Sequence, residues 1–117
     1  MSTKFWGKRG EQVAADFLER HGYAILARNY RFKRAEIDII AQKENLMLFI
    51  EVKLRSSTRF GFPEETVSEA QAARIALAAE EYLETHDCSS KLIRFDILAI
   101  SPVGNRFRVE HFKDAFC

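Results

Sequence analysis

Apolar side chains between residues 8 and 21 recur at the spacing of an α-helix, with one stripe of the helix facing a core. Gly22 follows directly and is a good residue to end a helix, because glycine adopts the left-handed backbone conformation without strain. The pattern therefore predicts a first helix over residues 8–21. Its apolar stripe consists of Val13, Ala14, Phe17, Leu18 and His21.

A second helical pattern covers residues 68–86. Ser68 and Gln71 match a capping box, in which the serine side chain accepts a hydrogen bond from a backbone amide in the first turn. One face of this segment is apolar, which predicts that it packs on a sheet or on another helix. That face carries Ile75, Ala79, Tyr82 and Leu83.

The remaining apolar segments are short and read as strands. Residues 28–34 form a basic connection or an extension of the first strand, residues 43–45 and 102–105 are turns, and residues 56–66 form a loop. The order helix, three strands, helix, two strands predicts one α/β domain over residues 1–117, with a mixed central sheet flanked by helices. The first predicted strand starts with residues 23–26. The other predicted strands cover residues 36–42, 46–55, 92–100 and 106–112.

The composition is that of an ordinary globular domain, with 47% hydrophobic and 30% charged residues among 117. The longest apolar runs have five residues, far fewer than a membrane span needs. No signal-peptide core is present in the first residues, and Cys88 and Cys117 lack metal-ligand spacing, so free thiols are expected. These features predict a cytoplasmic protein without a membrane partner.

Candidate chemistry lies on the second and third predicted strands, where Asp38 and Glu51 fall at positions that a core would fill with apolar residues. Regular alternation predicts one strand face with Glu36, Asp38 and Ile40 and the other with Ile37, Ile39 and Ala41. A tight hairpin would place the two carboxylates opposite or next to each other, on the face that also carries Lys53. Like charges this close repel unless a cation neutralises them, which favours Mg²⁺ or Mn²⁺. Lys53 could then orient a water molecule for phosphodiester hydrolysis. The alternative is an amphipathic hairpin whose polar face meets water.

Glu11 is a third candidate carboxylate, in line with Ala14 and Leu18 on the core-facing stripe of the first helix. A position in the first turn of the predicted helix would also stabilise the helix dipole. That alternative explains its place along the helix but not its inward direction, which suits a metal site better.

Basic residues are concentrated in the first half of the chain. Residues 1–60 carry 12 Lys or Arg and 7 Asp or Glu, whereas residues 61–117 carry 6 and 10. The asymmetry fits either an unevenly charged surface or a face for a polyanion. Tyr30 and Phe32 alternate with the cations and either stack on bases or join the core. The cations expected to contact nucleic acid are Arg28, Arg31, Lys33, Arg34, Arg55 and Arg59.

Together these motifs resemble the YraN-like family of small bacterial proteins, which is similar to the PD-(D/E)xK restriction-endonuclease-like superfamily and especially to Holliday-junction resolvases. The resemblance covers about residues 7–100. It rests on GEQVAA at 10–15, Asn29, EIDII at 36–40, FIEVKLR at 49–55, Phe60, Gly61 and RFD at 94–96.

The resemblance implies a restriction-endonuclease-like αβββαβ core with Asp38 and Glu51 as Mg²⁺ or Mn²⁺ ligands. It also implies Lys53 as the catalytic lysine and Glu11 as the carboxylate that completes or supports the metal site. The implied activity is that of an endonuclease on DNA, including branched DNA, in recombination or repair. A homodimer would allow the two cuts that a junction needs.

Two positions depart from the family pattern. Ala35 replaces a usual Gly before the acidic strand, and Gln71 stands where a Lys is usual near the start of the second helix. Gln71 either serves the capping box or faces the site as a nucleic-acid contact. The departures leave open a noncatalytic nucleic-acid-binding module, and a protein-interaction module is a third alternative.

Other polar residues predict structural roles. Asp96 alternates with Arg94 and is expected to form a structural ion pair. The histidines follow no zinc or catalytic-triad pattern. They are His21, His86 and His111.

Overall fold

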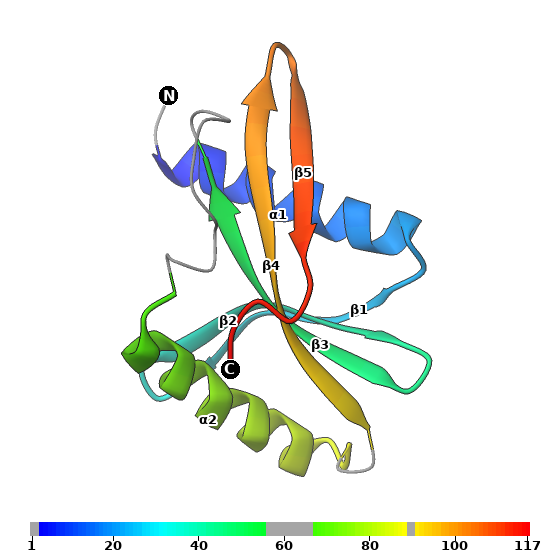
Figure 1. Ribbon diagram of the computed structural model, residues 1–117, viewed down its shortest axis with the longest axis vertical. Helices are drawn as coiled ribbons and strands as arrows, with labels where there is room; N and C mark the ends of the chain where they lie inside the picture. Colours follow the sequence, from blue (N-terminus) through cyan, green and yellow to red (C-terminus); the bar gives the residue numbers. More distant parts are fainter. Residues whose placement is uncertain (1–2, 56–66, 89–90) are drawn as a thin grey trace.

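A five-stranded sheet carries one helix on each face (Figure 1). The computed structural model describes residues 3–55, 67–88 and 91–117. The predicted loop at 56–66 therefore lies outside the described residues. The elements are α1 (Thr3–Arg20), β1 (Ala24–Phe32), β2 (Ala35–Lys43), β3 (Leu46–Leu54), α2 (Glu69–Thr85), β4 (Leu92–Val103) and β5 (Arg106–Phe112).

The strands follow one another across the sheet in the order β1-β2-β3-β4-β5. Neighbours pair antiparallel except β3 and β4, which are parallel. A parallel pair needs a long crossover connection, and α2 lies within it. The structure confirms the predicted α/β architecture, a mixed sheet flanked by helices, and it is compatible with an αβββαβ core.

Two apolar clusters, one on each face of the sheet, hold the layers together. Burial of apolar surface is the main favourable term for both. The cluster under α1 contains Ala14, Ala15, Leu18, Tyr23, Ile39, Ala41, Leu48, Ile50, Leu98 and Ile100. The cluster under α2 contains Ala35, Ile37, Ile40, Met47, Phe49, Ile75, Ala78, Ala79, Tyr82 and Phe95.

The end of α1 was predicted correctly and its start was not. The amide of Tyr23 donates to the Leu18 carbonyl at 2.9 Å and that of Gly22 donates to Glu19 at 3.1 Å, with a φ of 89° at Gly22. These bonds form a Schellman motif. The helix begins at Thr3, five residues before the predicted start, because the apolar stripe marks only the part that packs on the sheet.

The cap of α2 was predicted correctly. Ser68 has an extended backbone and its Oγ accepts from the Gln71 amide at 3.1 Å. The helix then runs from Glu69 to Thr85, with His86 as its C-cap. A serine cap of this kind stabilises a helix by about 1 kcal/mol. Among the described residues no helix is long and apolar enough to cross a membrane.

The predicted turn at 102–105 is shorter than expected. Pro102 pairs with Phe107 and Val103 with Arg106, so only Gly104 and Asn105 remain in the turn. Beyond Ile100, β4 has lost its β3 neighbour and pairs only with β5. Proline is tolerated there because an edge strand leaves one side of its backbone without a ladder.

One carboxylate is buried completely within the α1 side of the sheet. Asp96 has no exposed surface and accepts two hydrogen bonds from Arg94, both at 2.9 Å. It also lies 2.7 Å from His111 Nε2 and accepts from the Asp114 amide at 2.9 Å. Burial alone would raise the pKa of Asp96, but the bonds from His111, Arg94 and Asp114 outweigh it and hold the pKa at about 2. The expected structural ion pair is confirmed.

Replacing Asp96 by Ala is expected to lower the free energy of unfolding by about 3 kcal/mol or more, because Arg94 would be left half-buried without its partner. Since the folded pKa lies below the ordinary 3.8, this stabilisation is full above about pH 4 and is lost as the pH falls toward 2. Urea denaturation at pH 7 and pH 3 measures both effects.

Glu110→Ala is the matched control for Asp96→Ala. Glu110 forms an exposed ion pair with Arg108 at 3.8 Å, on the strand next to Asp96. Exposed pairs contribute at most about 1 kcal/mol. Equal losses in the two variants would contradict the structural role of the buried carboxylate.

Candidate functional site

A break in the strand alternation sets the direction of Asp38. In β1, Ala27 and Tyr30 both pack on the α2 side although they are three residues apart, and in β2 the same holds for Ile37 and Ile40. Regular strands place only residues two apart on one face. The break falls between the paired rungs on either side of Asn29 and Asp38, and Asn29 has a left-handed φ of 53°. The predicted regular alternation over residues 36–41 was therefore wrong.

The pairing of β2 with β3 stops at the same place. The last paired residues of this ladder are Ile39 and Ile50, so Asp38 and Glu51 are not ladder partners. Instead the side chain of Asp38 on β2 contacts the backbone of β3, and its Oδ2 accepts a hydrogen bond from the Val52 amide at 2.7 Å. A backbone amide that would otherwise lose its partner is satisfied by a carboxylate.

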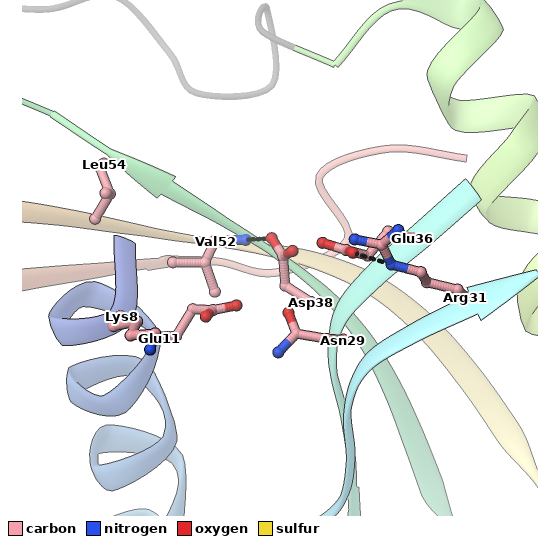
Figure 2. A pocket seen from close by; sticks show the side chains of 8 residues that line it. All are labelled: Lys8, Glu11, Asn29, Arg31, Glu36, Asp38, Val52 and Leu54. Carbon is pink, nitrogen blue, oxygen red and sulfur yellow. Dashed lines mark hydrogen bonds and ion pairs between the residues drawn. The ribbon is translucent and has the colours of Figure 1, made fainter. Parts of the chain in front are cut away.

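Asp38 points into a cavity of about 530 Å³ between α1 and the ends of β1, β2 and β3. Figure 2 shows Glu11 from α1 and Asn29 from β1 directed toward it, with Glu36 beside it on β2. Glu11 is half-buried and lies well inside α1, which excludes the first-turn helix-dipole explanation. Arg31 closes one side through an ion pair with Glu36 at 2.8 Å (Figure 2). The lining residues are Lys8, Glu11, Asn29, Arg31, Glu36, Asp38, Val52 and Leu54.

Glu51 and Lys53 approach the site from the α2 side. Lys53 Nζ lies 3.6 Å from Glu51 Oε1, and the two side chains are only 20% and 12% exposed. Gln71 Nε2 of α2 donates to the same Glu51 oxygen at 3.5 Å, a long hydrogen bond. The backbone of Gln71 thus serves the Ser68 cap while its side chain faces Glu51. A contact of Gln71 with nucleic acid stays a prediction.

The carboxylates perturb one another. Burial and, after it, the carboxylates of Glu51, Glu11 and Glu36 raise the pKa of Asp38, the hydrogen bond from the Val52 amide lowers it, and the net value is about 7. Burial also raises the pKa of Glu51, while Lys53 and Gln71 lower it. Within residues 3–55, 67–88 and 91–117, Asp38 therefore has no cation as an ion-pair partner. Such a carboxyl group is a typical site for a cation or for proton transfer.

The oxygen donors suit a hard divalent cation. Mg²⁺ is commonly held by one or two carboxylates, with water and substrate phosphate as its other ligands. Asp38, Glu51 and Glu11 are the residues that could supply such carboxylates, because the charges of Glu51 and Glu11 both act on Asp38. Within the described ranges no three Asp, Glu, His or Cys side chains are arranged to hold a metal ion. The donor set therefore fits a cation that shares its coordination with water or phosphate, and does not form a closed protein cage.

The cations expected to contact nucleic acid do not form one patch. Arg28 donates to Gln12 of α1 at 3.1 Å and Arg31 pairs with Glu36, so both lie toward the α1 side. Lys33 and Arg34 occupy the two-residue turn between β1 and β2. Arg55 is half-buried after β3, and Arg59 lies outside the described residues.

Glu36 and Asn29 lie at the site although neither was predicted as a site residue. Glu36 raises the pKa of both Asp38 and Glu51, and it stands two residues before Asp38, the spacing of side chains on one strand face, so that spacing was a usable signal. Asn29 was visible as one of the residues that carry the family resemblance, but its approach to Asp38 depends on the pairing of β1 with β2, which the sequence does not show.

Replacing Asp38 by Asn is expected to stabilise the metal-free protein at pH 8. The pKa of the folded carboxyl is about 7 against the ordinary 3.8, so folded-state stability falls as the pH rises from about 4 to 7 and stays low above that. Asn avoids this loss and still offers an oxygen to the Val52 amide. The melting temperature in EDTA should rise by roughly 4 °C or more at pH 8, with the difference vanishing near pH 4.

Asp16→Asn is the matched control, because Asp16 is an exposed carboxylate on α1. Its melting temperature should follow that of the unmodified protein at both pH values. An Asp38→Asn variant that is less stable than the unmodified protein at pH 8 would contradict the charge repulsion described above.

Comparison with known proteins identifies the relatives of this chain. It is 46% identical over 110 residues to a UPF0102 protein of Flavobacterium psychrophilum, covering 94% of this chain and 92% of that one. It is 44% identical over 118 residues to a UPF0102 protein of Dictyoglomus thermophilum, covering 99% and 100%. The chain spans almost the whole length of both relatives.

Among solved structures, that of Pyrococcus furiosus SfsA in complex with Ca²⁺ is similar at 16% sequence identity and a TM-score of 0.39, covering 96% of this chain and 64% of that one. A score this low does not establish a shared fold. The family model of the Uncharacterised protein family UPF0102 matches residues 10–100. This match and the two close relatives show that the chain belongs to the UPF0102 family.

Proposed function

We propose that this protein is a metal-dependent nuclease of the PD-(D/E)xK type that hydrolyses phosphodiester bonds in DNA. The observation that carries the proposal is the half-buried Asp38 carboxylate, which is held by Val52 near Glu11 and Glu51, has its pKa raised to about 7 and forms no ion pair with a described Lys or Arg. The charged Asp38 carboxylate lowers the stability of the folded protein, and a bound cation would remove this destabilisation. A destabilising ionisable group in a cavity is typical of a functional site.

Asp38 and Glu51 would hold Mg²⁺ or Mn²⁺, with Glu11 supporting the site from α1. When bound, the cation would neutralise the scissile phosphate and lower the pKa of water. Lys53 lies beside Glu51, where its ammonium group can orient the attacking water and stabilise negative charge on the phosphate. The water oxygen would attack phosphorus and give up one proton to solvent, the bond from phosphorus to the leaving sugar oxygen would break, and that oxygen would take up a proton from solvent.

The substrate would approach over the open side of the cavity. The described part of the chain supplies cations near this opening, Lys8 and Arg31, which can contact phosphates on either side of the cleaved one. Phosphate contacts position a nucleic acid without reading its sequence. We therefore propose structure-selective or nonspecific cleavage, with branched DNA as the first substrate to test.

Lys53→Ala is expected to reduce Mg²⁺- or Mn²⁺-dependent cleavage of a four-way DNA junction or of single-stranded DNA by about 100-fold or more, because the charge beside the scissile phosphate is lost. Asp38→Ala should reduce it equally, since the cation loses a ligand. Product formation on denaturing gels measures the rate.

Lys113→Ala is the control for Lys53→Ala, because Lys113 is an exposed lysine beyond β5. Its cleavage rate should equal that of the unmodified protein. Cleavage that survives both Asp38→Ala and Lys53→Ala would come from a contaminant or from another site and would refute these assignments.

Cation binding can be tested without any substrate. Mg²⁺ or Mn²⁺ at about 100 times its dissociation constant should stabilise the folded protein by about 2.7 kcal/mol, because it binds only the folded site. The melting temperature should therefore rise with cation concentration. The rise should be absent in Glu51→Gln and unchanged in Glu81→Gln, a half-buried glutamate of α2. A cation-independent melting temperature would count against a metal site.

A noncatalytic nucleic-acid-binding module is the second candidate function, and the uncharged Gln71 beside Glu51 favours it. Such a module would bind DNA in a salt-dependent manner and cleave none with any cation. Substituting Gln71 by Lys then discriminates: appearance of cleavage in the Lys variant alone would assign the unmodified protein to this second class.

A further inference from the structure

A second pocket lies at the β1–β2 turn, where α2 passes it, and differs in character from the carboxylate cavity. Its volume is about 250 Å³ and its wall is almost wholly apolar. It lies outside the set of residues that line the carboxylate cavity. The lining residues are Phe32, Lys33, Arg34, Ala35, Arg74 and Leu77.

The charges around this pocket are all positive. The lining set contains three cations and no carboxylate, whereas the other cavity contains three carboxylates. The three cations are exposed, so their aliphatic stems contribute to the wall while their charged ends reach water. Lys33 Nζ lies 5.4 Å from the centroid of the Phe32 ring. An aromatic surface and a cation are therefore immediate neighbours.

Helix α2 connects this pocket to the proposed active site. Ala35 in the pocket wall faces α2, whereas the next residue, Glu36, lines the carboxylate cavity on the α1 side, so the two cavities open on opposite faces at the start of β2. Arg74 follows Gln71 by three residues on α2, so the two side chains lie on neighbouring turns of one helix face, and Gln71 contacts Glu51. A strand of nucleic acid bound beside Glu51 on the α2 side can thus continue along α2 toward the turn.

We infer that this pocket is a subsite for one unpaired nucleobase, with its neighbouring phosphates bound by Lys33, Arg34 and Arg74. The inference rests on the proposed function and names a feature of its substrate. A volume of about 250 Å³ is below the range of sites for drug-sized ligands and suits a single planar group. An apolar and aromatic wall stacks on a base of any sequence, and cations contact the backbone.

The subsite explains an exposed leucine on α2. Leu77 lines the pocket and is 56% exposed. An unpaired base would cover it, and a fully paired duplex would keep its bases out of reach. The protein should accordingly prefer DNA that has unpaired nucleotides next to the cleaved bond, such as single strands and junction branch points.

The test compares base contacts in Leu77→Asp with those in Leu92→Asp, in EDTA so that no cleavage occurs. Leu92 is also an exposed leucine, 65% exposed, at the opposite end of the sheet, and its substitution introduces the same charge. The probes are a labelled thymidine oligomer about twelve nucleotides long and its abasic counterpart with the same phosphates. Fluorescence anisotropy at low salt measures both affinities.

The unmodified protein and Leu92→Asp should bind the normal oligomer about five-fold or more tightly than the abasic one, the least that one stacked base contributes. In Leu77→Asp this preference should fall below about two-fold. Arg74→Ala should instead weaken both oligomers by similar factors, because it removes a phosphate contact. Arg106→Ala, an exposed arginine on β5, should leave both affinities unchanged.

An equal preference for normal over abasic DNA in all variants would overturn the subsite. The proposed nuclease would not be affected by that result, because the Lys53→Ala cleavage assay tests it separately. If Lys53→Ala cleaves DNA as fast as the unmodified protein, while Leu77→Asp alone loses the preference for normal over abasic DNA, the nuclease assignment is refuted and the subsite is supported. If a peptide of alternating Glu and Phe binds through Leu77 and DNA does not, the pocket belongs to an acidic protein partner and the subsite is refuted.

Discussion

The hydrogen bond from the Val52 amide to the Asp38 carboxylate is the contact on which the site depends. It spans 2.7 Å at the point where the β2–β3 ladder stops, so a side chain replaces the missing strand partner. The bond holds Asp38 beside Glu11 on the α1 side and within the field of Glu51 on the other.

Two acidic side chains in this fold experience opposite environments. Asp96 has no exposed surface, but Arg94, His111 and an amide satisfy it, and its pKa is held at about 2. Asp38 is less deeply buried and has one amide against three carboxylates, and its pKa rises to about 7. The first arrangement stabilises the sheet. The second leaves negative charge without compensation, and this uncompensated charge makes the cavity a candidate for a cation.

Local signals predicted the secondary structure well. Ser68 and Gly22 define helix ends through hydrogen bonds within a few residues, so the chain alone carries that information. The candidate residues Glu11, Asp38, Glu51 and Lys53 were also visible, since polar groups interrupted otherwise apolar stripes and strands. The regular alternation expected around Asp38 was wrong because Asn29 and Asp38 lie where two strands change phase together, and no local pattern encodes a pairing between distant residues.

The sequence by itself thus determined the order of the elements, the apolar faces of both helices and the identity of the charged residues that could take part in chemistry. Only the tertiary structure decided which of these residues meet. Glu36 and Asn29 line the same cavity as Asp38, and Gln71 contacts Glu51. Among the predicted nucleic-acid contacts, Arg31 lies at that cavity, whereas Lys33 and Arg34 lie at the pocket beside α2. The physical reason is that propensity and capping act over a few residues, whereas burial, charge repulsion and strand separation depend on segments brought together by folding.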